Sequence, residues 1–252
     1  SFKMRYLRKI FTTMALMTIF SVSVFAKSGF EFHYNALLGV GVSFPTTSMK
    51  DMGFKNDIGF DGTGLFQIGY MRQVKEGFGI SYLLELGYNF SSYTISGKPD
   101  FNPIINDIFG LGNIIGNIFP NDMSVALDFT FYNIQIGLFP KFNFGNFSIG
   151  IGGGVKIPVI GEMSVTATAI NVEETKKLSR TDIADFFNPP IFGYVKTSLA
   201  YSFYLTDKIA LDVGLYLSYD IMQFINEGGK DEYGGTLNTG IIFGLKFGGK
   251  VD

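Results

Sequence analysis

The chain has 252 residues, a length that suits one domain or two small ones. Charged residues make up 17% and hydrophobic residues 46%, and the formal net charge of −2 gives no indication of a nucleic-acid partner. Cysteine is absent and histidine occurs once, which excludes disulfides, thiolate metal sites, a cysteine nucleophile and a histidine-rich metal site. We expect no cofactor and no metal.

Residues 1–26 have the pattern of a secretory signal peptide. Four basic residues precede an apolar stretch at 10–25, and Val24 and Ala26 occupy the two small-residue positions of a cleavage site. The alternative is a retained anchor helix, which is disfavoured because no charged, helix-compatible segment follows. We therefore expect export through the periplasm and a mature chain of residues 27–252.

Beyond residue 26, hydrophobic residues recur at every second position, the pattern of strands with two different faces. We predict eight strands, at 30–44, 62–73, 78–91, 124–144, 147–160, 191–206, 209–221 and 236–248. In the fourth segment the apolar positions change phase above Tyr132, from even to odd residue numbers, which predicts a bulge near there.

The connections between these segments alternate in length. Short ones at 74–77, 145–146 and 207–208 alternate with long ones at 45–61, 92–123, 161–190 and 222–235. In an antiparallel up-and-down arrangement all short turns lie at one end and all long loops at the other. Outer-membrane barrels have this layout, with short periplasmic turns and long external loops. We predict an all-β, eight-stranded antiparallel transmembrane β-barrel.

Alternation does not by itself say which face is outside, because a soluble lipocalin-like barrel has its apolar face inward. The apolar phase carries many large aromatic and aliphatic side chains, while the other phase is rich in Gly, Ala, Ser and Asn. An eight-stranded barrel has an interior just wide enough to be filled by side chains. The bulky phase therefore faces outward, toward lipid, with aromatic residues at the membrane interfaces.

The inward phase contains three acidic and three basic residues, and a buried charge is costly unless it is paired. The predicted lumen network comprises Glu31, Glu85, Asp212, Lys156, Lys196 and Lys246. Glu31 and Lys246 lie near the periplasmic ends of the first and last strands, so we expect them to pair. The balance favours a plugged, salt-bridged lumen; the alternative is that some of these charges lie in wide, hydrated ends.

With these features, residues 27–252 resemble the small eight-stranded outer-membrane barrels of the OmpA/OmpX type. The resemblance is one of pattern and carries no catalytic motif. It implies outer-membrane lipid and the barrel-insertion machinery as partners. Members commonly end in an aromatic residue that this machinery reads, whereas here Phe247 is followed by residues 248–252.

Two long loops have distinctive compositions. Segment 161–190 mixes both signs of charge and is expected to be solvated, with a short helix near Thr181–Phe187. Segment 92–123 is unusually apolar for an external loop, and it could cap the barrel, lie at the lipid interface or bind an apolar ligand. Its candidate contact residues are Ile104, Ile105, Ile108, Phe109, Ile115, Ile118 and Phe119.

Three functions are compared. The favoured one is a structural or surface-interaction protein that presents its loops to a surface ligand. The second is a passive channel for small hydrophobic molecules, resembling OmpW-type barrels, whose apolar upper pocket opens sideways into the membrane. An enzyme is disfavoured because no acid, base and nucleophile come together in the sequence, and a metal site at Glu31 and His33 is less expected than a hydrogen bond in the lumen.

Overall fold

The computed structural model describes residues 29–98, 124–167, 172–187, 189–224 and 232–251. The predicted signal peptide, residues 1–26, lies outside them and stays a prediction. No helix in these ranges is long and apolar enough to cross a membrane.

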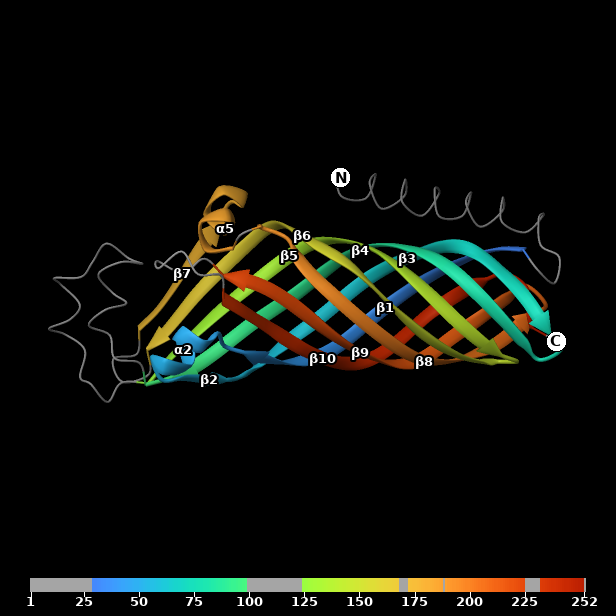
Figure 1. Ribbon diagram of the computed structural model, residues 1–252, viewed down its shortest axis with the longest axis horizontal. Coiled ribbons are helices and arrows are strands. Elements are labelled where there is room, and N and C mark those ends of the chain that lie inside the picture. The colour runs from blue at the N-terminus through green and yellow to red at the C-terminus, as the bar shows by residue number, and fades with distance from the viewer. Residues whose placement is uncertain (1–28, 99–123, 168–171, 188, 225–231, 252) are drawn as a thin grey trace, which may run out of the picture.

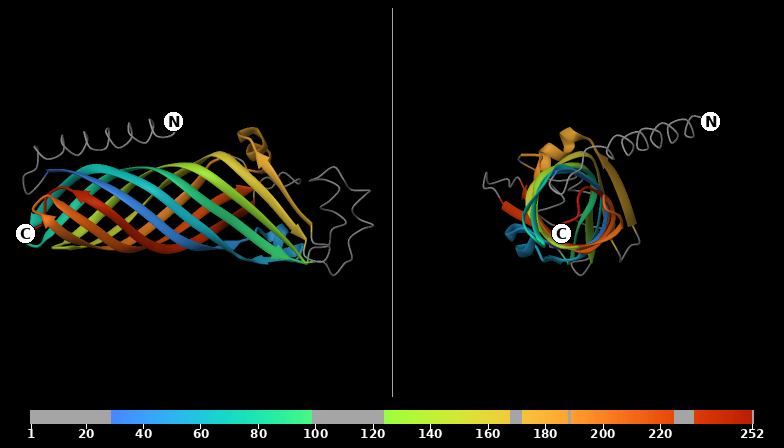
Figure 2. Two further views of the ribbon diagram at one scale, coloured as in Figure 1. Left: turned by 180° about the vertical axis from the view of Figure 1, so that it is seen from behind. Right: turned by 90° about the vertical axis from the view of Figure 1, so that its right-hand side faces the viewer.

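The described part of the chain forms one antiparallel sheet that closes on itself (Figures 1 and 2). Eight long strands follow each other around the ring, and the last pairs with the first, in a register that places Phe243 opposite Ala36. This confirms the predicted eight-stranded up-and-down barrel. The eight strands are β1 (Gly29–Phe44), β3 (Ile58–Lys75), β4 (Phe78–Gly97), β5 (Val125–Phe144), β6 (Phe147–Ala167), β8 (Phe192–Thr206), β9 (Ile209–Phe224) and β10 (Glu232–Phe247).

Short turns and long connections lie at opposite ends of the barrel, as predicted. The short turns include Gly77 and Gly145, whose φ angles of +72° and +57° are conformations that glycine adopts without steric cost. The long connections carry their own elements. These are α2 (Thr47–Asp51) and β2 (Phe54–Asn56) after β1, and β7 (Val172–Leu178) and α5 (Arg180–Phe186) after β6. The predicted short helix near Thr181–Phe187 is α5.

Several strands extend further toward the long connections than we predicted. β4 continues from Ser91 to Gly97, β6 from Ile160 to Ala167, and β3 begins at Ile58 within the predicted loop 45–61. β2 pairs with β4, and β7 pairs with β6. The sheet β2–β4–β5–β6–β7 therefore projects beyond the ring on the side of the long connections, which we call the external side.

The change of apolar phase in β5 is not a bulge in that strand. Its odd-numbered residues face inward along the whole strand, from Val125 and Phe131 to Asn133 and Gln135. What changes is the environment: below Tyr132 the inside is polar, and above it the inside is apolar. The irregularity in pairing lies on the neighbouring strand, where Val159 is the extra residue between the partners of Tyr132 and Asn133.

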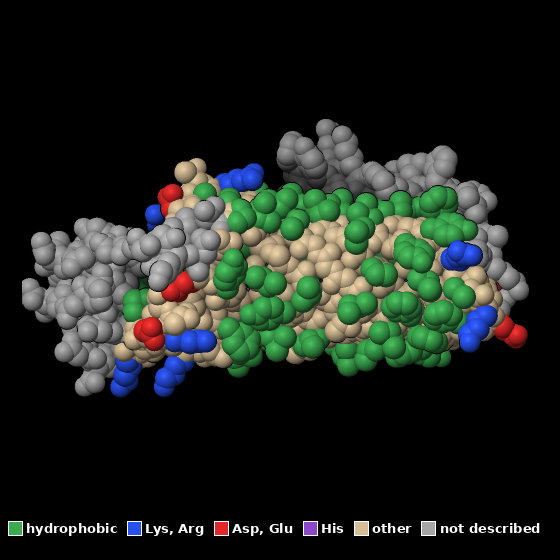
Figure 3. Space-filling view, in the orientation of Figure 1, with side chains coloured by type: hydrophobic (Ala, Val, Ile, Leu, Met, Phe, Trp, Pro, Cys, Tyr) green, Lys and Arg blue, Asp and Glu red, His purple; other side chains and the backbone are tan. Residues whose placement is uncertain are grey.

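The middle of the barrel carries a belt of outward apolar side chains, which Figure 3 shows on one face. Leu38 and Leu138, for example, are 62% and 66% exposed, whereas polar residues of the same strands, such as Asn35 and Asn133, are buried. Charged side chains gather toward the two ends of the molecule in the same view. A closed sheet with an apolar band outside and polar groups inside satisfies all the requirements for crossing a bilayer.

Candidate functional site

The interior of the barrel holds ionised side chains in three layers, which we name lower, middle and upper from the short-turn end. The middle layer centres on Glu85 of β4, which is fully buried. Lys196 Nζ lies 2.7 and 3.0 Å from its two carboxylate oxygens. Tyr194 donates its hydroxyl to the same carboxylate at 2.9 Å, and Gln67 donates its amide at 2.6 Å. The carboxylate is thus fully hydrogen-bonded, as a buried charge requires.

The upper layer centres on Lys156 of β6. Its Nζ lies 2.7 Å from Asp220 Oδ2 and 3.6 Å from Asp61 Oδ1. The Tyr216 hydroxyl donates to Asp61 Oδ2 at 2.7 Å, and the Asn238 amide donates to Asp220 Oδ2 at 3.1 Å. One ammonium therefore bridges two carboxylates, and neighbouring polar side chains donate to both, while Asp220 Oδ1 has no hydrogen-bond partner among the described residues.

The lower layer contains the predicted pair of Glu31 and Lys246, whose Oε2 and Nζ lie 3.6 Å apart. The His33 ring lies between two carboxylates. Its Nε2 is 3.5 Å from Glu31 Oε2, and its Nδ1 is 3.2 Å from Asp212 Oδ2. Ser202 donates its hydroxyl to Asp212 at 2.6 Å. Both ring nitrogens of His33 face carboxylate oxygens, so the ring lies between Glu31 and Asp212.

The network is larger than the six predicted residues. It also includes Asp61, Lys141 and Asp220, each at most 5% exposed, together with His33. The interior network thus comprises five acidic residues, four lysines and His33. Asp61 was assigned to a loop because β3 begins earlier than predicted. Asp220 shares the inward parity of Asp212 on β9, and this signal was available in the sequence.

Little free space lies between these layers. A cavity of about 10 Å³ between the lower and middle layers is bordered by Lys141, Lys196 and Asp212. A second cavity of about 10 Å³ lies between the middle and upper layers, bordered by Tyr194 and Tyr216. Each is close to the smallest space that holds one water molecule. Within the described residues, no group of three or more acidic or histidine side chains is arranged to hold a metal ion.

Above the upper layer, the external end of the barrel is filled by an apolar cluster. Its centre is a set of buried aromatic rings. The ring centroid of Phe131 lies 5.6 Å from that of Phe187 and 5.0 Å from that of Phe192, and the centroids of Phe187 and Phe224 are 4.7 Å apart. The full cluster is Phe54, Tyr93, Ile95, Phe129, Phe131, Met163, Leu178, Ile183, Phe187, Phe192, Met222 and Phe224. It combines the upward extensions of the barrel strands with β2, β7 and α5.

Helix α5 is fixed by its N-terminal residues. Ser179 donates its hydroxyl at 2.5 Å and its backbone amide at 2.7 Å to the carboxylate of Asp182, and its own hydroxyl accepts from the Asp182 amide. These hydrogen bonds hold the pKa of Asp182 below its ordinary value. The capping box directs Ile183 into the apolar cluster.

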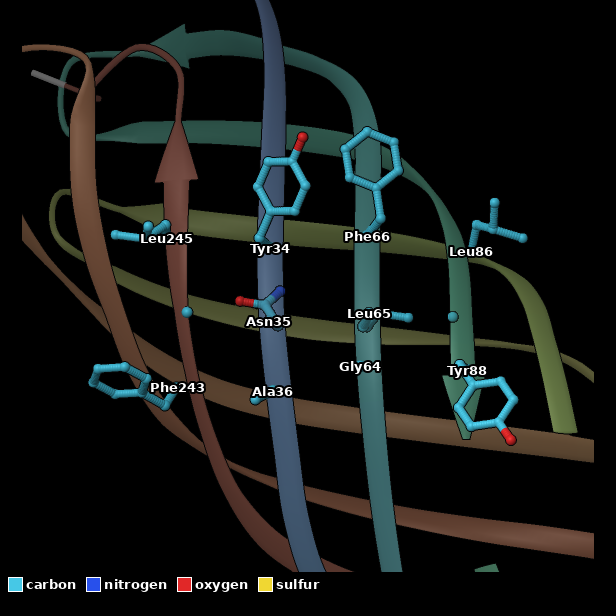
Figure 4. Close-up of a pocket in the computed structure, with 12 residues that line it drawn as sticks. Tyr34, Asn35, Ala36, Gly64, Leu65, Phe66, Leu86, Tyr88, Phe243 and Leu245 are labelled. Carbon is cyan, nitrogen blue, oxygen red and sulfur yellow. The ribbon is translucent and has the colours of Figure 1, made fainter. Parts of the chain in front are cut away.

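A larger hollow, of about 560 Å³, lies on the outside of the barrel within the apolar belt (Figure 4). Its floor includes Ala36 and Gly64, which are paired across β1 and β3, and larger side chains such as Phe66, Tyr88 and Phe243 surround it. It faces the acyl chains of the bilayer. The predicted apolar contact residues between Ile104 and Phe119 lie outside the described residues.

No family model matches the sequence, and no curated protein matches it. Three solved structures illustrate the similarity found. Neisserial surface protein A is 15% identical, with 86% of this chain and 99% of that chain covered and a TM-score of 0.36. Ail of Yersinia pestis, in complex with the heparin analogue sucrose octasulfate, is 12% identical (86% and 99% covered, TM-score 0.31). The outer membrane protease OmpT of Escherichia coli is 11% identical (90% and 99% covered, TM-score 0.35).

At these scores the similarity carries no argument about what this chain binds or does. The chain's own features are sufficient for its class. Its sheet closes into a ring, its belt is apolar on the outside, and its short turns and long connections lie at opposite ends. The chain is an outer-membrane β-barrel.

Proposed function

We propose that this barrel is a structural and surface-interaction protein with a plugged lumen, which presents its external elements to partners outside the cell. The observation that carries the proposal is the direct contact of oppositely charged groups at three heights of the interior. Glu85 of β4 and Lys196 of β8 meet at 2.7 Å, and the cavities on the two sides of this pair hold about 10 Å³ each. A conducting pore needs a continuous wet path, and contacts of this kind oppose one.

The external side supports the second half of the proposal. Five strands continue beyond the ring as one sheet, and this sheet is held by the apolar cluster on its inner face. A rigid element that projects from a membrane barrel can present side chains and backbone groups to a partner at low entropic cost.

The test is a planar-bilayer recording of the refolded chain, residues 27–252, with a known porin in the same bilayers as the positive control. We expect no steady conductance. A steady open conductance of this chain would overturn the plugged lumen and with it the proposed structural role.

We propose no enzymatic role. The one histidine, His33, is 1% exposed, lies in the lower layer and is held between Glu31 and Asp212. A general base must reach its substrate, and the described external end provides no histidine.

A second candidate, passive passage of small hydrophobic molecules, is favoured by one feature of the wall. β6 pairs with β8 only up to Lys156 and with β7 only from Gly161, so residues 157–160 have neither strand beside them. The exposed side chains of Val159 and Ile160 border this gap from the lipid side, and the apolar cluster lies within the barrel at the same height.

Uptake measurements test this candidate. Deleting Ile104–Phe119 should lower entry of a hydrophobic substrate into cells, since this apolar segment connects the external ends of β4 and β5. Deletion of residues 225–231, a shorter connection between β9 and β10, is the control for general loss of connecting segments at this end. Unchanged entry after the first deletion would remove the candidate.

A further inference from the structure

The external sheet has a free edge. β7 pairs with β6 from Leu178 opposite Gly161 to Val172 opposite Ala167, and within the described residues its other edge pairs with no strand. Glu174, Thr175, Lys176 and Lys177 are all exposed. The unpaired N–H and C=O groups of an edge strand are a template for another strand, and proteins usually manage such edges with charged side chains.

The charges on this edge are arranged so that the strand complements itself. β7 reads Val-Glu-Glu-Thr-Lys-Lys-Leu, with two acidic residues before Thr175 and two basic residues after it. If two copies of β7 pair in antiparallel register centred on Thr175, position 174 lies opposite 176 of the other copy, and 173 lies opposite 177. Every acidic position then meets a basic one, which is the favourable cross-strand combination.

We infer that β7 is a homotypic docking edge, at which a second copy of this chain adds its own β7 to form one continuous sheet. The inference rests on the proposed surface-interaction function and names the partner. The contact is isologous, because the same edge serves both copies and residue 174 contacts 176 in both directions. A parallel in-register arrangement would place like charges opposite each other, which is destabilising.

The symmetry places the two copies in different membranes. The two-fold axis that relates antiparallel neighbours is perpendicular to their sheet. The external sheet continues the barrel wall, because β5 and β6 remain paired up to Val125 and Ala167 (Figure 1). The axis therefore runs parallel to the membrane plane, and the second copy is inverted relative to the first. Two facing outer membranes satisfy this geometry, so the contact joins cell to cell.

The edge has to exchange one contact to form the interface. Lys176 Nζ lies 3.7 Å from Asp182 Oδ1, and the Lys176 side chain is 64% exposed. Such an exposed pair is weak, so that Lys176 is free to exchange it for Glu174 of a second copy. Many weak contacts between two cells act together, which allows a small interface to hold them.

Cysteine cross-linking tests the register directly, since the native chain has no cysteine. Thr175→Cys places a thiol opposite itself across the two-fold axis, at the separation of directly opposed residues in antiparallel strands, which permits a disulfide. Lys177→Cys is the matched control, because it faces residue 173. Cells that carry the chain with two different tags are mixed under mild oxidation. We expect a mixed-tag disulfide dimer with Thr175→Cys and none with Lys177→Cys; no dimer, or equal dimer from both, would overturn the inference.

Charge exchange tests the partner. Glu174→Lys and Lys176→Glu each create like-charge pairs in a homotypic contact, while a mixture of the two restores every pair at 174 and 176. Cells with the unaltered chain should cluster, cells with either variant alone should cluster several-fold less, and mixed populations should cluster again in alternating contacts. Clustering that both variants retain, or a mixture that fails to recover it, would contradict the inference.

Failure of the homotypic edge can be distinguished from failure of the proposed function. The conductance recording tests the plugged lumen, and β7 lies outside the ring that encloses the charged layers. A non-conducting barrel whose cells do not cluster would refute only the homotypic edge.

Discussion

Removal of Glu85 from the middle layer should destabilise the barrel more than removal of Glu85 and Lys196 together. Glu85→Leu leaves the Lys196 ammonium, 5% exposed, without the carboxylate that lies 2.7 Å away. Breaking a buried pair in this way costs about 3–5 kcal/mol because a charge stays buried without compensation. Lys196→Met should cost a similar amount by leaving the carboxylate with only its neutral donors.

The double variant Glu85→Leu/Lys196→Met removes both charges and fills the space with side chains of similar size. Only the Tyr194 hydroxyl and the Gln67 amide then lack their acceptor, at about 1–3 kcal/mol each. The buried apolar replacements offset part of that cost. We therefore expect the double variant to be at least as stable as either single variant.

The assay is equilibrium unfolding in urea of chains refolded into lipid vesicles, followed by circular dichroism because the chain has no tryptophan. The two single variants and the double variant form a mutant cycle, and the predicted coupling is several kcal/mol. A double variant whose loss equals the sum of the two single losses would refute the direct pairing of Glu85 with Lys196.

Three further predictions use the same assay. Gly137→Ala should cost about 1–3 kcal/mol of unfolding free energy, because a Cβ there lies 2.1 Å from the Tyr194 hydroxyl oxygen. The control Gly64→Ala, on the open outer face, should change stability by less than about 0.5 kcal/mol. Equal effects of the two variants would contradict the packing of Tyr194 against Gly137. Phe131→Ala should cost about 3–5 kcal/mol, since its fully buried ring contacts Phe187 and Phe192; a loss below about 1 kcal/mol would mean that the apolar cluster is loosely packed. Leu138→Arg, in the apolar belt, should cost about 2–4 kcal/mol. Thr130→Arg, which points outward on the same strand above the belt, should cost at most about 1 kcal/mol. The reverse order would show that the membrane boundary lies elsewhere on β5.

The strand phases and the direction of the bulky face followed from the sequence, because a closed narrow barrel leaves only one side for large side chains. β1 and β9, whose alternation is nearly strict, have the predicted starts and ends to within three residues. The inward position of Glu85, Asp212 and Lys196 followed from the same parity.

The strand ends could not be read from hydrophobicity, because the polarity of the two faces reverses where a strand leaves the membrane. In β4, Tyr93 and Ile95 continue the inward row of Glu85 and Asn89, although they are apolar. A pattern that assumes one polarity per face ends the strand at this reversal. The same reversal suggested a bulge in β5. Asp61 is a different case, because Ile58 and Phe60 beside it are exposed and continue the normal outward apolar row of β3.

The short external elements were missed for a different reason. β7 contains charged residues without alternation, and β2 has only three residues, so neither has a hydrophobic period. Both are formed by pairing with the extended ends of β4 and β6, which is a tertiary effect. The helix α5 was predictable because its capping residues are local in sequence.

The direction of the side chains in β5 can be measured residue by residue. Spin labels attached to single cysteines at 133–138, in refolded chains in vesicles, report collision with oxygen, which is concentrated in the acyl-chain region. Positions 134, 136 and 138 should show high oxygen accessibility, and 133, 135 and 137 low accessibility, in strict alternation. Accessibility that peaks at 133, 135 and 137 would show that the apolar side chains fill the barrel and do not contact lipid.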